Sequence, residues 1–73
     1  MSIQDMSDNA VIALMGERIQ RERLNQNMTQ EGLAEKAGIG VRTVRSLETG
    51  DKTTMETLIR TLRALGKLGT LDA

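Results

Sequence analysis

Residues 30–49, QEGLAEKAGIGVRTVRSLET, carry the strongest fold signal in this chain. They predict two short helices joined by a turn at Gly38, which can take the positive φ of a helix end because it has no Cβ. Ala34 is a small residue where the second helix would cross the first. The apolar positions that point to one common side are Leu33, Ala37, Ile39, Val44 and Leu47. This spacing is typical of a helix-turn-helix unit, and the rest of the chain reads as its support.

Size and composition exclude several classes of protein. The chain has 73 residues, enough for one domain with a small core. It contains no Cys and no His, so the usual zinc ligand sets and nucleophile–imidazole pairs cannot be assembled. It also lacks Phe, Tyr and Trp, which removes base stacking and argues against most single-strand and RNA-binding modules. We therefore predict that the protein is not an enzyme and holds no metal or cofactor.

The first residues and the apolar runs bear on location. No apolar run approaches the length needed to cross a bilayer. The start, MSIQDMSDNA, lacks the basic beginning and the continuous apolar stretch of a secretory signal. The sequence therefore predicts a cytoplasmic helical protein without a membrane partner.

The charges are unevenly distributed although their formal sum is zero. Residues 1–17 carry three carboxylates and neither Lys nor Arg. Residues 18–47 hold the basic residues Arg18, Arg21, Arg23, Lys36, Arg42 and Arg45 against Glu22, Glu31 and Glu35. The basic excess therefore sits on and beside the helix-turn-helix unit, while the zero total predicts weak sequence-independent binding to nucleic acid and a need for specific contacts or dimerisation.

Helix start and stop signals predict an all-α protein, a compact bundle of four to five helices. Ser7 caps a first helix that runs to about Gln26 and is weakened, with a possible bend, at Gly16. Its expected inner residues are Val11, Leu14 or Met15, Ile19 and Leu24. Thr29 caps a helix over 30–37, and Gly40 and Gly50 bound a helix over 41–49.

The second half of the chain continues this pattern. Thr53 and Glu56 have the spacing of a capping box for a helix that runs to Leu65. Leu68 and Leu71 suggest the start of a fifth helix. We expect residues 1–6 to be flexible and 7–73 to form a single domain, with the helix-turn-helix unit at 30–49.

The residues along most of the chain also match a known family. From about Leu14 to Leu71 the chain resembles the XRE-type helix-turn-helix family, the phage repressor and Cro DNA-binding domains. The residues that carry the resemblance are Arg23, Met28-Thr29-Gln30, Leu33-Ala34, Ala37-Gly38-Ile39, Val44, Leu47-Glu48 and Gly50. The resemblance implies a lambda-repressor-like domain that acts as a sequence-specific transcriptional regulator, with repression as the expected effect. It also implies a bacterial or phage origin and a homodimer on an approximately palindromic double-stranded operator.

The outer side of the helix over 41–49 is the expected reading surface. If Val44 and Leu47 face the core, a turn of about 100° per residue places five other residues outside. These are Val41, Arg42, Arg45, Ser46 and Thr49. Arg42 is the first candidate for direct base contact, because a guanidinium can pair with guanine O6 and N7. Val41 could touch a thymine methyl, and Arg45 and Ser46 a base or a phosphate; in the alternative reading the arginines are solvated surface charges.

Other residues are expected to support this surface. The resemblance implies that Gln30 contacts the DNA backbone, and that Arg23 and Glu48 form a partly buried structural ion pair. The predicted phosphate contacts beside the reading helix are Thr43, Thr49, Lys52 and Thr53. Gln30 is otherwise an ordinary polar residue of a first helical turn.

A second class of function stays open. The chain could be an antitoxin-like interaction module that neutralises a partner protein and regulates its own operon, with Leu68 and Leu71 as partner contacts. Together with Leu65, the same leucines could form a two-fold contact between two copies.

Overall fold

The computed structural model describes residues 2–71, with side chains described through Gly69. Within this range lie four α-helices, two short 3-10 helices and no strand. In chain order they are η1 (Ile3–Asp5), α1 (Asp8–Asn25), α2 (Gln30–Ala37), α3 (Val41–Glu48), α4 (Met55–Ala64) and η2 (Leu68–Leu71). The prediction of an all-helical bundle is correct, and the expected fifth helix is present as a single 3-10 turn.

Side-chain caps start three of the four α-helices. Ser7 accepts a hydrogen bond from the backbone amide of Ala10, and Thr29 accepts one from that of Gly32. The capping box predicted between Thr53 and Glu56 is wrong, because Thr54 is the cap and accepts from the amide of Thr57. Thr54 follows Thr53 directly and carries the same side-chain hydroxyl, so it can also accept a hydrogen bond from a free backbone amide of the first turn. The helix therefore starts one residue later than predicted.

The helix-turn-helix unit has the predicted turn geometry. Gly38 has φ 71° and ψ 35°, and the next amide, of Ile39, donates to the carbonyl of Ala34. This pattern is a Schellman end, which needs a left-handed residue at the position of Gly38. Gly50 ends α3 in the same way, with φ 89°. The helix stops at Glu48 rather than at the predicted 49, and Thr49 is its C-cap residue.

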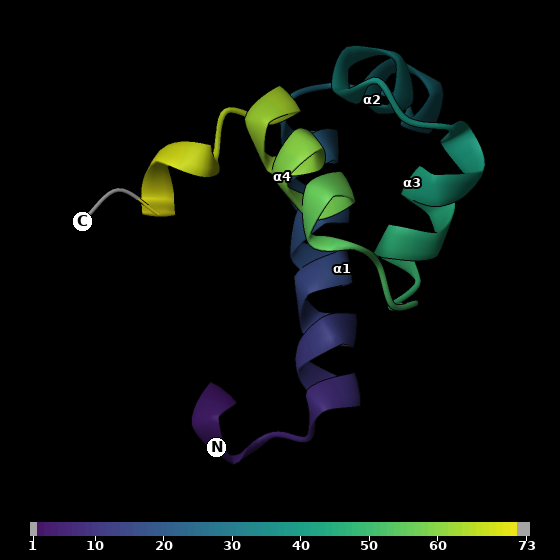
Figure 1. Cartoon of the computed structure of the whole chain (residues 1–73). Helices are drawn as coiled ribbons and strands as arrows, with labels where there is room; N and C mark the ends of the chain where they lie inside the picture. Colours follow the sequence, from purple (N-terminus) through teal and green to yellow (C-terminus); the bar gives the residue numbers. More distant parts are fainter. Residues whose placement is uncertain (1, 72–73) are drawn as a thin grey trace.

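A small apolar core joins the helices. Helix α3 packs on both α1 and α2, and α2 also packs on α4 (Figure 1). The buried apolar residues are Ile19, Leu33, Ala34, Ala37, Val44, Leu47, Ala64 and Leu65. The core predicted for the helix-turn-helix unit is thus present, with Ile39 packed at its edge.

One residue predicted for the inner side of the first helix is instead exposed: Leu24, at 56%. Of the alternatives Leu14 and Met15, Leu14 is half-buried and Met15 is 40% exposed. Met55, the first residue of α4, is 81% exposed although it is large and apolar. Helical spacing shows which residues share one face of a helix, but it does not show how much of that face the neighbouring helices cover. Leu65, offered as a contact between copies, is buried in the core at 3% exposure, and the side chain of Leu71 lies outside the described range.

Gly16 marks the closest approach of α1 to α3. An added Cβ would lie 2.2 Å from the carbonyl oxygen of Leu47, a separation that no real Cβ tolerates. The predicted role of Gly16 as a weak point of α1 therefore misses its main function. The missing side chain lets the backbone of α1 lie against the C-terminal end of α3, where Glu48 begins the contacts described below.

Gly16→Ala therefore tests this helix crossing. Helix propensity alone predicts stabilisation by about 1 kcal/mol. We expect instead a net loss of about 1–3 kcal/mol in the free energy of unfolding, because α1 and α3 must move apart. Urea denaturation followed by circular dichroism measures the change.

Gly32→Ala is the matched control for that experiment. Its Cβ would meet only the Thr29 hydroxyl, at 3.1 Å. We expect it to change stability by less than Gly16→Ala does. A Gly16→Ala protein as stable as the parent would contradict the close approach.

Candidate nucleic-acid interface

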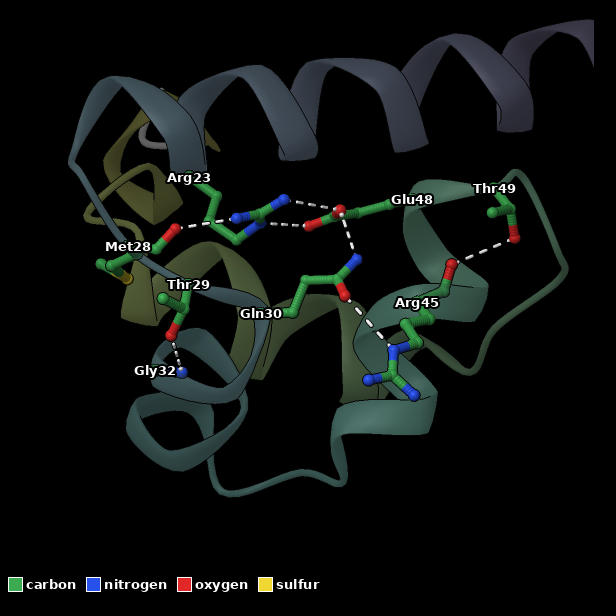
Figure 2. A network of polar contacts seen from close by, with 8 residues as sticks. All are labelled: Arg23, Met28, Thr29, Gln30, Gly32, Arg45, Glu48 and Thr49. Atoms are coloured by element: carbon green, nitrogen blue, oxygen red, sulfur yellow. Dashed lines mark hydrogen bonds and ion pairs between the residues drawn. The ribbon is translucent and has the colours of Figure 1, made fainter.

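A buried ion pair joins α1 to the end of α3. The Nε of Arg23 donates to Glu48 Oε2 at 2.6 Å, and Nη2 donates to Oε1 at 3.1 Å, so the contact is bidentate (Figure 2). The side chains are 8% and 2% exposed. The hydrogen bonds to Glu48 raise the pKa of Arg23 above its already high ordinary value, so the guanidinium stays charged.

The same guanidinium also holds the connection between α1 and α2. Its Nη1 donates to the backbone carbonyl of Met28 at 2.8 Å. One planar cation on α1 therefore contacts both the turn before α2 and the end of α3, a geometry that suits the fork of an arginine and not the point charge of a lysine. Arg23 and Glu48 thus form the expected structural pair, with a third partner that the sequence did not indicate.

Gln30 links this buried pair to the surface of α3. Its Nε2 donates to Glu48 Oε1 at 3.1 Å, and its Oε1 accepts from Arg45 Nε at 3.3 Å (Figure 2). Charge dictates this orientation, because the amide NH2 faces a carboxylate and the amide oxygen faces a guanidinium. Gln30 is therefore more than a polar residue of the first turn of α2, since it restrains the arginine next to it on α3.

The outer face of α3 carries the candidate contact residues. Arg42 and Arg45 are exposed, Ser46 is half-buried, and Val44 and Leu47 are turned into the core. Neither arginine forms an ion pair within residues 2–71. Both 3-10 turns near the chain ends lie on the side of the bundle away from α3, which leaves this face uncovered in the described chain (Figure 1).

Val41 differs from its predicted position. Val41 is half-buried and packs against the core cluster. The expectation that its side chain lies on the outer side of the helix is therefore wrong for the part that faces the core. Val41 is the first residue of α3 and follows Gly40, which supplies no side-chain cap. The packing of Val41 against the core stabilises the first turn instead. Little of its surface is left for a thymine methyl.

The loop after α3 comes close to the outer face of α3. Together, α3 and this loop line a shallow hollow of about 300 Å³. Its lining residues are Arg42, Thr43, Ser46, Leu47, Lys52 and Thr53. Six residues from two segments therefore meet at one place, and two of them are the cations Arg42 and Lys52. Such a hollow offers positive charge and hydroxyl donors together, which is the chemistry that binds phosphate.

Thr49 is the weakest member of the predicted set. Its hydroxyl donates to the carbonyl oxygens of Arg45 and Ser46, at 3.0 and 3.1 Å. A phosphate oxygen can only accept, so a contact would require this hydroxyl to leave the helix end. Its observed role is to satisfy two carbonyl groups at the C-terminus of α3.

The described chain contains neither a metal centre nor a membrane-spanning helix. Among residues 2–71, no group of three or more Asp or Glu side chains is placed to hold a metal ion. No helix in the same range combines the length and the apolar character needed to cross a bilayer.

Comparison with known proteins agrees with this geometry. The family model described as helix-turn-helix, of the XRE type, matches residues 19–70. The match includes Arg23, Gln30, Glu48 and the whole outer face of α3. None of the curated proteins matches the chain significantly.

Arg23→Met tests the buried pair. It leaves Glu48 charged and buried without its partner, and we expect a loss of about 3–5 kcal/mol in the free energy of unfolding. The control is Arg21→Ala, which removes an exposed pair with Glu17 at 3.5 Å and should cost less than about 1 kcal/mol. Urea denaturation compares the two.

Because the first variant could fail to fold, the double variant Arg23→Met/Glu48→Leu completes the test. Replacing both partners by apolar side chains removes the stranded charge, and we expect the double variant to be more stable than Arg23→Met alone. Equal losses for Arg23→Met and Arg21→Ala would contradict the structural role of the pair.

Proposed function

The chain belongs to the XRE-type helix-turn-helix family, and from this membership we propose that it is a sequence-specific regulator that reads double-stranded DNA with α3. The observation that carries the proposal is the outer face of α3, where Arg42 and Arg45 project beside the hollow shared with Lys52. Repression is the proposed effect, because a protein bound over a promoter blocks the access of other proteins to that DNA. The proposal includes no enzymatic activity, and it places the protein in the cytoplasm of a bacterium, where the DNA is.

The proposed docking follows from the direction of α3. Its first turn enters the major groove most deeply, so Arg42 reaches the base edges first. A guanidinium there pairs with guanine through two parallel hydrogen bonds. Arg45 lies one turn later, and Ser46 beside it can reach a base or a phosphate.

The phosphate contacts are assigned to the flanking residues. Lys52 and Thr53, in the loop after α3, line one hollow with Thr43 of α3, and we assign all three to the phosphates of one DNA strand. A backbone contact by Gln30 remains part of the proposal, although its side chain is held by Glu48 and Arg45. Its position as the first residue of α2 also presents the free amides of that helix end to a phosphate.

We further propose that two copies bind together. A symmetric pair on an approximately palindromic operator places the two α3 helices about 34 Å apart, one helical turn of DNA. With zero net charge, a single copy gains little from long-range attraction, and pairing would supply the missing affinity. Selection of bound sequences from random duplex DNA tests sequence preference and palindromy at once.

The two kinds of cation should respond differently to removal. We expect Arg42→Ala to weaken binding to the selected operator by about 1–3 kcal/mol and to relax the preference at one base pair. Lys52→Ala should weaken binding to all duplexes alike and reduce the slope of log affinity against log salt concentration by about one. Fluorescence anisotropy with matched and mismatched duplexes measures both. If Arg42→Ala binds the operator as tightly as the parent protein does, the proposal that α3 reads the DNA sequence is wrong.

Gln30 and Arg45 should act as a pair in DNA binding. If Gln30 restrains the guanidinium of Arg45, the losses in binding free energy from Gln30→Ala and Arg45→Ala will not add. We expect the double variant to fall short of their sum by about 0.5–3 kcal/mol, the range for directly contacting residues. Arg42→Ala with Gln30→Ala is the control pair, since no hydrogen bond joins those two side chains in the described structure. Additive losses for both pairs would contradict the link.

A further inference from the structure

A second basic surface lies on α2 and α4, away from the residues proposed to read DNA. It is an open hollow of about 800 Å³, larger than the one beside α3. We call it the basic hollow, and its lining is three cations, Lys36, Arg60 and Arg63, one carboxylate, Glu56, and the apolar Ile59 with two alanines. No residue is shared between its lining and that of the hollow beside α3.

The charge of the basic hollow is unbalanced within the described chain. Arg60 is partly engaged, since its Nη2 lies 3.8 Å from Glu56 and its Nη1 donates weakly to the carbonyl of Gly38 at 3.5 Å. Lys36 and Arg63 form no ion pair with any described residue. Two of the three cations are thus free to pair with carboxylates from outside.

Apolar side chains continue beside the cations. Met55, Ile59 and Arg63 follow at intervals of four residues, so they share one face of α4. Ile59 is 37% exposed and Met55 81% exposed, although both are large and apolar. The surface therefore combines an apolar stripe with a cationic end, the pattern that accepts an amphipathic segment in a groove.

We infer that the basic hollow is a docking site for an acidic, amphipathic segment of a partner protein. Two or more Asp or Glu side chains of that segment pair with Lys36 and Arg63, and an apolar side chain covers Ile59. The binding is independent of the proposed reading of DNA, because the two surfaces share no residue. The protein can then hold DNA and a partner at the same time.

Nucleic acid fits the basic hollow less well than a peptide. The chain has no aromatic side chain on which the bases of a single strand could stack. A duplex offers only phosphates and sugars away from its grooves, which would leave Ile59 and Met55 without an apolar partner. Charge complementarity together with the apolar stripe therefore favours a protein segment.

The test uses the full chain labelled with 15N and a synthetic peptide of alternating Glu and Leu pairs as the probe. We expect the peptide to shift the amide resonances around Lys36, Ile59 and Arg63 and to leave those of Arg42 and Arg45 in place. A peptide with Glu alone should bind at least about fivefold more weakly, since the apolar contact is missing. Shifts confined to any other surface would overturn the inference.

Arg63→Glu supplies the mutational arm. We expect it to weaken peptide binding about tenfold, because an attraction becomes a repulsion at the centre of the site. Arg18→Glu, an equal charge change at an exposed position of α1, is the matched control and should leave the affinity within about twofold. Equal losses for both variants would mean attraction to the whole protein and not to this hollow.

Two further measurements separate the other occupants. If duplex DNA shifts the resonances of Lys36 and Arg63 before those of α3, the basic hollow binds nucleic acid and the inference is wrong. If sedimentation shows that Arg63→Glu turns a dimer into a monomer, a second copy occupies the hollow, which also overturns it. If duplex DNA does not shift the resonances of α3, the proposed function is wrong, while the peptide result is unaffected.

Discussion

The buried pair of Arg23 and Glu48 holds the helices of this small protein in their relative positions. Its members lie 25 residues apart in sequence and are almost completely removed from water. A charge at such a depth is tolerated only with its full set of partners, so α1, the turn at Met28 and the end of α3 must stay together. The pair therefore fixes where α3 lies more than it adds to net stability.

The close contact at Gly16 makes that pair geometrically possible. Without a side chain there, the backbone of α1 lies against the carbonyls of Leu47 and Glu48. An apolar core of this size resists small shifts weakly, because it contains mainly Ala and Leu and no aromatic residue. Backbone contact and a bidentate ion pair supply the directional restraint that such a core lacks.

Gln30 carries this restraint outward to the surface. It contacts the buried carboxylate with one end of its amide and Arg45 with the other. A surface arginine has many rotamers, and holding it in one before binding reduces the entropy lost on contact with a base or a phosphate. The buried carboxylate of Glu48 thus helps to set two features. It fixes the position of α3 through Arg23, and it orients the side chain of Arg45 through Gln30.

Local signals in the sequence were enough to predict the helices, their turns and the inner side of the helix-turn-helix unit. Caps, left-handed glycines and apolar spacing act within a few residues, and among the caps the prediction was wrong only at the start of α4, where two threonines could each serve. The exposure of Leu24 and Met55, the partial burial of Val41 and the role of Gly16 emerged only when the helices were packed together. Each of these depends on which helix lies opposite, and spacing along one helix carries no information about its neighbour. The same holds for the Gln30 bridge and the basic hollow, because their residues are far apart in sequence and meet only after the helices pack.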